Sequence, residues 1–184
     1  QTLLLNKKFI VLLGFMGVGK TSLGRGLSKK LNLPHIDTDF EIEKVKNMKI
    51  SSIFESYGES YFRELEQNII IDIFSKNQES VISLGGGSFL NIKIREHIKN
   101  KCISIWLNAN VDTIYKRITK SNNIRPVFSR LKSKNDLEVL LHERSQVYKE
   151  ADIKIDSENL NKYSLVEKVL YKIDDYLEKK DENY

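Results

Sequence analysis

The stretch that decides the fold lies near the start of the chain, where residues 8–27 read KFIVLLGFMGVGKTSLGRGL. Its first part, residues 8–13, is a short apolar run that is typical of a buried strand in a parallel sheet. Glycines follow, and from Thr21 to Leu31 leucine recurs every fourth residue, the spacing of an amphipathic helix. A strand, a glycine-rich turn and a helix in this order predict a βα unit.

The turn of this unit carries a phosphate-binding motif. Residues 14–21 (GFMGVGKT) match the pattern G-x-x-x-x-G-K-[ST]. Glycines let backbone N–H groups face a phosphate, and the helix N-terminus adds the positive end of its dipole. We expect Lys20 to bridge the β- and γ-phosphates of ATP and the Thr21 hydroxyl to ligate Mg²⁺. A dinucleotide fingerprint fits less well, because its third glycine is missing. The residues of this segment expected to bind ATP are Gly14, Gly17, Val18, Gly19, Lys20, Thr21 and Ser22.

Strand and helix patterns alternate along the rest of the chain, which predicts an α/β fold. Four more apolar runs read as strands, at residues 34–37, 80–84, 102–107 and 152–155. Helices are expected at residues 21–31, 40–46, 50–57, 60–75, 91–99, 111–119, 136–150 and 165–177, with fraying from Glu178 onward. We therefore predict three layers, a five-stranded parallel sheet with helices on both faces. By length, residues 1–184 form one domain.

One long segment carries neither pattern and is a candidate lid. Residues 120–135 are polar, basic and interrupted by Pro126. Connections of this length without their own secondary structure are uncommon unless they are functional. An arginine on a lid can cover a transferring phosphoryl group, so Arg125 is a candidate catalytic and ATP-binding residue.

Composition limits the other possibilities. The chain is 40% hydrophobic and 30% charged, a globular balance, with a formal net charge of +5. It has one cysteine, Cys102, which excludes an internal disulfide, and no apolar run near the ~20 residues of a membrane span. No basic block is interleaved with aromatic residues, so we expect neither nucleic acid nor a membrane as partner. These features favour a cytoplasmic protein, which we expect to be a monomer.

Two carboxylates follow the second predicted strand. Asp37 and Asp39 are two residues apart, so on an extended segment they point to the same side. Ligands of open parallel sheets bind beyond the carboxyl ends of the strands. One carboxylate can hold a Mg²⁺-bound water, while the other accepts a proton from an attacking hydroxyl. The alternative is a helix N-cap at Thr38 or Asp39.

Three further features are candidates for substrate binding. Gly85-Gly86-Gly87 leaves the backbone bare after a strand, although a mobile turn is the alternative. Arginine is rare here beside lysine, so Arg63 and Arg144 are candidates for bidentate recognition of a carboxylate. Arg63 and Glu66 share a helix face, and an ordinary surface ion pair is the alternative.

Taken together, these motifs resemble those of shikimate kinases. They run in that family's order over residues 8–156: the phosphate loop, Asp37-Thr-Asp39, Phe62-Arg63-x-x-Glu66, Gly85-Gly86-Gly87, Arg125-Pro126 and Glu143-Arg144-x-x-x-Tyr148. The resemblance implies ATP-dependent phosphorylation of the 3-hydroxyl of shikimate, a step of chorismate and aromatic amino acid biosynthesis. It also implies a nucleoside-monophosphate-kinase-like sheet with a lid.

The resemblance assigns roles to individual residues. It implies that Asp37 supports Mg²⁺ beside Thr21, that Arg117 lies near adenine, and that Phe54 and Phe62 wall the substrate ring. The helices of residues 38–76 would carry much of the substrate site. The residues implied to bind shikimate are Asp39, Arg63, Gly85, Gly86, Gly87 and Arg144; the catalytic ones are Asp39, Lys20 and Arg125.

The chain departs from the family pattern in two places. Valine and phenylalanine follow Pro126 where leucines are usual, and residues 155–159 (IDSEN) lack the arginine that many members carry beside adenine. Two other classes stay open on the sequence alone. One is another small-molecule kinase of the same fold, such as a gluconate or nucleotide kinase. The other is a non-catalytic nucleotide-binding module.

Overall fold

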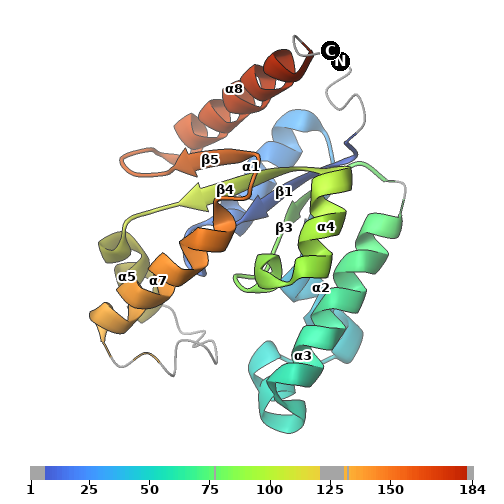
Figure 1. The fold of residues 1–184 in the computed structure, drawn as a ribbon, viewed down its shortest axis with the longest axis vertical. Coiled ribbons are helices and arrows are strands. Elements are labelled where there is room, and N and C mark those ends of the chain that lie inside the picture. The colour runs from blue at the N-terminus through green and yellow to red at the C-terminus, as the bar shows by residue number, and fades with distance from the viewer. Residues whose placement is uncertain (1–6, 77, 121–130, 132, 182–184) are drawn as a thin grey trace.

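Five parallel strands form the centre of the computed structural model, which describes residues 7–76, 78–120, 131 and 133–181 (Figure 1). The sheet has the order β2-β3-β1-β4-β5, and every neighbouring pair is parallel. The strands are β1 (Phe9–Leu13), β2 (His35–Asp37), β3 (Ser80–Ser83), β4 (Cys102–Asn108) and β5 (Ile153–Asp156). The predicted α/β class and parallel sheet are confirmed.

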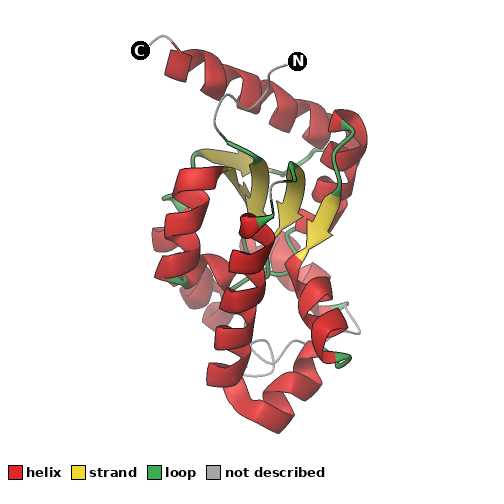
Figure 2. Ribbon diagram, turned by 90° about the vertical axis from the view of Figure 1, so that its right-hand side faces the viewer, coloured by secondary structure: helices red, strands yellow, loops and turns green. Residues whose placement is uncertain are grey.

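Helices cover both faces of this sheet (Figures 1 and 2). They are α1 (Lys20–Leu31), α2 (Thr38–Lys46), α3 (Ile50–Ser75), α4 (Ile92–Lys101), α5 (Val111–Thr119), α7 (Lys134–Tyr148) and α8 (Lys162–Asp181), with a short 3₁₀ turn at Ser88–Leu90. Side chains alternate between the two faces of β1. Leu12 packs in one core cluster with α1 and α8, whereas Val11 packs in another with α3 and α4. All residues of β1 are buried, which explains its unbroken apolar run.

The sheet register brings the candidate motifs to one edge. Ser83 at the end of β3 lies opposite Leu12 of β1 on one side and Asp37 of β2 on the other. Each of these three strands leads into one motif: β1 into the phosphate loop, β2 into Asp37 and Asp39, and β3 into the triple glycine. This is the carboxyl edge, where open parallel sheets bind ligands.

Most helix boundaries lie within a few residues of the sequence prediction, and three regions need comment. The two helices expected on either side of Gly58 lie within α3, and Gly58 keeps them apart as a non-helical kink with φ 83° and ψ 172°, as the sequence indicated. Helix α8 continues to Asp181, so the expectation of fraying from Glu178 was wrong for these residues. Helix α7 begins at Lys134, capped by Ser133, so the last residues of the expected lid, 120–135, are helical. Residues 121–130 and 132, with Arg125, lie outside the described residues.

Candidate active site

The phosphate loop is folded around the Lys20 side chain. Lys20 is buried, and its Nζ donates hydrogen bonds of 2.8 Å to the carbonyl oxygens of Gly14 and Phe15. Gly19 ends the loop with φ 107°, a left-handed conformation that glycine adopts at little cost, and α1 begins at the next residue. The ammonium group and the first turn of α1 therefore lie together, as an anion-binding loop requires.

Thr21 and Asp37 join this loop to the second strand. Thr21 Oγ1 donates a 2.6 Å hydrogen bond to Asp37 Oδ2. The other carboxylate oxygen, Oδ1, accepts hydrogen bonds from the backbone N–H groups of Asp39 and Phe40 at 3.1 and 3.3 Å. Asp37 is therefore the N-cap of α2, a role that the sequence alone placed at Thr38 or Asp39.

A polar hollow opens beside the phosphate loop and gathers every residue predicted to bind the substrate. It is lined by Met16, Asp39, Ile50, Phe54, Phe62, Arg63, Glu66, Gly85, Gly86, Gly87 and Arg144. The phenyl rings of Phe54 and Phe62 lie 4.5 Å apart, centre to centre, and form an apolar wall. We call this hollow the acceptor pocket.

The glycines of the acceptor pocket are required by close approach. A Cβ atom at Gly85 would lie 2.5 Å from Asp39 Oδ1, and one at Gly87 would lie 2.8 Å from both terminal nitrogens of Arg63. The backbone of Gly86 meets the phosphate loop, because a Cβ atom there would lie 3.2 Å from the backbone nitrogen of Met16. This segment therefore packs directly between the charged side chains and the loop.

A buried carboxylate holds one of the two arginines. Arg63 Nη1 donates a 2.7 Å hydrogen bond to Glu66 Oε1, and Ser88 Oγ donates a 2.8 Å hydrogen bond to Glu66 Oε2. Glu66 is only 2% exposed, so this is not the surface ion pair that the sequence left as an alternative. Burial raises the pKa of the Glu66 carboxyl, and the nearby Arg63 charge opposes that shift.

The other arginine is held by aromatic and backbone contacts. Arg144 is buried; its Nη1 donates a 3.2 Å hydrogen bond to the Gly86 carbonyl, which also accepts a 2.5 Å hydrogen bond from Tyr148 Oη. The Arg144 guanidinium lies 4.9 Å from the centre of the Phe15 ring. Its Nε has no hydrogen-bond partner among the described residues.

A larger cavity, of about 840 Å³, lies on the other side of the phosphate loop. Arg117 borders it and donates hydrogen bonds to the carbonyl oxygens of Gly17 and Val18 at 3.3 and 3.0 Å. Ser157 and Leu160 line it too, although the sequence named no residue beyond 155 for the nucleotide. We call it the nucleotide pocket.

An acidic residue that belongs to no sequence motif holds this wall of the nucleotide pocket in place. Glu158 Oε1 accepts a 2.8 Å hydrogen bond from the Asn110 backbone N–H at the start of α5. The loop after β5 is therefore tied to the helix that carries Arg117. Glu158 stands in the segment where the family's arginine is absent, and it joins this segment to the start of α5.

The oxygen ligands near the loop fit a magnesium ion that arrives with a nucleotide. Among the described residues no group of three or more His, Cys, Asp or Glu side chains could hold a metal ion. Mg²⁺ is usually held by one or two protein oxygens together with substrate phosphates. The Thr21 hydroxyl and the Asp37 carboxylate provide such oxygens beside the loop.

In the part of the chain that the structure describes, no helix is long and apolar enough to cross a membrane.

The fold and the two pockets define a P-loop kinase, with an acceptor pocket and a nucleotide pocket that meet at the phosphate loop. The family model for shikimate kinase matches residues 16–174. A shikimate kinase of Rhizobium meliloti is 37% identical over 172 residues, covering 94% of this chain and 88% of the relative. One of Mesorhizobium japonicum is 39% identical over 166 residues, covering 90% and 81%.

A solved structure gives the same result. The shikimate kinase of Acinetobacter baumannii, in complex with shikimate, is 31% identical with a TM-score of 0.84, covering 91% of this chain and 93% of that one. The chain belongs to the shikimate kinase family, and its activity is that of a shikimate kinase, a phosphotransferase. This excludes the gluconate kinase, nucleotide kinase and non-catalytic alternatives.

Proposed function

We propose that the acceptor pocket binds shikimate through Arg63, Arg144 and Asp39, and that the phosphate loop presents ATP to its 3-hydroxyl. The observation that carries the proposal is the convergence of these three side chains on Gly85–Gly87. Two arginine forks and a carboxylate suit a small hydroxylated acid, because planar guanidinium groups bind carboxylates in a bidentate manner. A nucleoside monophosphate would need a base-binding pocket as well, whereas two arginines beside a bare glycine backbone suit a small carboxylate better.

The arginines would hold the substrate carboxylate. Glu66 fixes Nη1 of Arg63, while Nη2 lies 3.8 Å from the Glu59 carboxylate and would turn from it to the ligand. Arg144 has an unpartnered Nε and a guanidinium anchored on Phe15. Phe54 and Phe62 would cover the carbon ring of the substrate. The backbone of Gly85, Gly86 and Gly87 would approach the same molecule closely.

Asp39 would orient the attacking hydroxyl and accept its proton. Asp39 lines the acceptor pocket at the start of α2, with its Oδ1 against Gly85. Phosphoryl transfer needs little covalent chemistry from the protein, and positioning with charge neutralisation supplies most of the rate. Lys20 would neutralise charge on the phosphates once it exchanges its loop carbonyl partners for phosphate oxygens.

The remaining assignments concern the nucleotide. Thr21 and Asp37 would hold Mg²⁺, which when bound neutralises phosphate charge. Arg117 would lie beside the adenine ring, with Ser157 and Leu160 opposite. Arg125, outside the described residues, stays a prediction: it would cover the phosphates from the lid and exclude water. The residues proposed for ATP are Gly14, Gly17, Val18, Gly19, Lys20, Thr21, Ser22, Arg117 and Arg125.

The proposal also covers the setting of the enzyme. Cys102 is a free, buried thiol, which accords with a reducing compartment. We therefore propose a single-domain, monomeric cytoplasmic enzyme.

A coupled assay of ADP release, with and without shikimate, tests the proposal. ADP should form rapidly only when shikimate is present, and shikimate with its 3-hydroxyl removed should bind without being phosphorylated. Transfer to another hydroxyl, shown by NMR of the product, would overturn the assignment of Asp39.

A further inference from the structure

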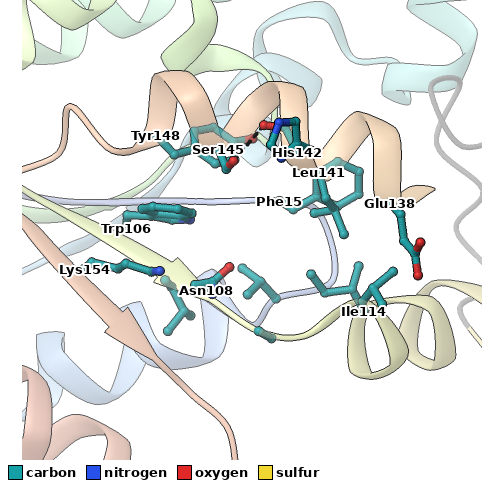
Figure 3. Close-up of a pocket in the computed structure, with 14 residues that line it drawn as sticks. Phe15, Trp106, Asn108, Ile114, Glu138, Leu141, His142, Ser145, Tyr148 and Lys154 are labelled. Atoms are coloured by element: carbon teal, nitrogen blue, oxygen red, sulfur yellow. Dashed lines mark hydrogen bonds between the residues drawn. The ribbon is translucent and has the colours of Figure 1, made fainter. Parts of the chain in front are cut away.

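A third pocket, of about 330 Å³, lies between α7 and the end of β4, apart from both pockets described above (Figure 3). We call it the Trp106 pocket. None of its lining residues lines the acceptor pocket, and Val18 alone is shared with the nucleotide pocket. Its walls are mainly apolar and aromatic with a few polar groups, the usual lining of a site for a small molecule.

The floor of this pocket is a paired tryptophan and lysine. Trp106 of β4 lies directly opposite Lys154 of β5 in the sheet register. On β5, Lys154 and Asp156 are exposed while Ile153 and Ile155 are buried, so this face of the edge strand is open to solvent. Lys154 Nζ lies 4.7 Å from the centre of the Trp106 ring. Trp106 is only 8% exposed, and the ammonium group covers its indole face at this end of the pocket.

The roof of the pocket is rigidly placed, from Tyr148 above Trp106 at the Lys154 end to Phe15 nearer Glu138. Tyr148 is fixed by its hydrogen bond to Gly86, and Phe15 by the guanidinium of Arg144. Leu141 and Ser145 face the pocket from α7, one turn apart. Because these walls are held by contacts of the acceptor pocket, a ligand meets a largely preformed surface and loses little free energy in ordering it.

The charges of the pocket are separated. In Figure 3, Lys154 lies at one end beside Trp106 and Glu138 at the other, beyond Phe15 and Leu141. The Lys154 ammonium is loosely paired with Asp156. The Asp156 Oδ1 atom is 4.0 Å away and already accepts a 2.8 Å hydrogen bond from Asn108. Both charged side chains are more than half exposed. A ligand anion at the Lys154 end lies away from the Glu138 carboxylate and competes with Asp156 for the ammonium group.

We propose that the Trp106 pocket binds a small aromatic carboxylate, with its ring against Trp106 and its carboxylate paired with Lys154. The lysine side chain is flexible, so its ammonium group can move off the indole and pair with the ligand carboxylate. The ligand ring then occupies the indole face that the ammonium group has left. Aromatic rings stack favourably on tryptophan in an offset arrangement. The site does not depend on the residue roles proposed above.

The chain contains one tryptophan, so its fluorescence reports on the surroundings of Trp106, which include Tyr148 and through it the acceptor pocket. We would titrate the full-length protein with benzoate, benzamide and benzylamine while saturating shikimate keeps the acceptor pocket filled. Benzoate should change the emission in a saturable manner and bind more tightly than the neutral or cationic probe. Benzoate with no saturable effect, or with an effect that is seen only when shikimate is left out, would overturn the proposal.

Variants at Lys154 separate a built site from weak adsorption. Lys154→Gln should weaken benzoate about fivefold, as expected for an exposed ion pair, and leave benzamide unchanged. Lys154→Glu should reverse the order, so that benzylamine binds better than benzoate. Lys93→Gln, the same change at an exposed residue of α4, is the matched control. Equal affinities for benzoate in the Lys154→Gln and Lys93→Gln proteins would contradict the assigned pairing.

Discussion

Arg63 and Glu66 lie one turn apart on α3, and Arg63 Nη1 donates a 2.7 Å hydrogen bond to a carboxylate that is 2% exposed. The buried Glu66 carboxylate fixes the orientation of the guanidinium group, while the Arg63 side chain is 30% exposed at the acceptor pocket. The pair therefore has a fixed end inside the protein and an open end toward a ligand.

Arg63→Lys keeps the charge and loses the planar fork. We expect shikimate to bind more weakly by about 1.5–3 kcal/mol, the range for a hydrogen bond to a charged group. Calorimetric titration with each ligand measures the change in affinity. The matched control is Arg25→Lys, at an exposed position of α1. ATP binding should hardly change. Equal weakening of ATP and shikimate would make Arg63 a structural residue.

Glu66→Gln tests the cost of the buried charge. Burial raises the pKa of Glu66 in the folded protein above its unfolded value of 4.5, so the native state binds more protons than the unfolded state in that range. Glu66 ionisation therefore lowers the free energy of unfolding as pH rises above about 4.5. The stability of Glu66→Gln relative to the parent should rise over the same interval.

Urea unfolding between acidic and neutral pH measures this difference. Glu64→Gln, the same change at an exposed neighbour, should show no such trend. A parallel course for the parent and Glu66→Gln would show that Arg63 fully compensates the burial of the carboxylate.

Lys20→Ala removes the ammonium that the phosphate loop encloses. We expect turnover to fall about 10³-fold or more, since a preorganised charge at the transferring group contributes several kcal/mol. Circular dichroism should show whether the variant is folded. Near-normal turnover in the folded variant contradicts the assignment.

Asp37→Asn separates the metal role from the helix cap. Asparagine still accepts the hydrogen bonds that begin α2, so the fold should persist. Loss of the negative charge should raise the Mg²⁺ concentration for half-maximal activity by about 10- to 100-fold, as for residues that support a metal's ligands. Asp72→Asn, at an exposed position of α3, is the control. An unchanged Mg²⁺ requirement would leave Asp37 as a cap alone.

Arg125→Ala addresses the lid. A contact made mainly as the transition state forms should lower kcat more than it raises KM for shikimate. Single-turnover measurements with excess enzyme isolate the transfer step. A rise in KM alone, with kcat intact, would move Arg125 from catalysis to simple binding.

The sequence by itself determined the class and the main motifs. A buried strand, a glycine-rich loop and an amphipathic helix specify a phosphate-binding unit through local patterns, because period and turn chemistry are encoded within a few residues. Alternation of apolar runs and helices gave the parallel sheet, and the positive φ of Gly58 accounts for a helix break that the sequence already indicated.

Tertiary structure decided how these motifs combine. The sheet order set Asp37 beside Thr21, and close packing set Asp39 and Arg63 against the glycine backbone. The spacing of Arg63 and Glu66 fits an ordinary surface ion pair, and only the burial of Glu66 shows that it is not one. Glu158 belongs to no sequence motif, although it holds the loop after β5. Such contacts join residues far apart in the chain. Their energies depend on burial and distance, which local sequence does not encode.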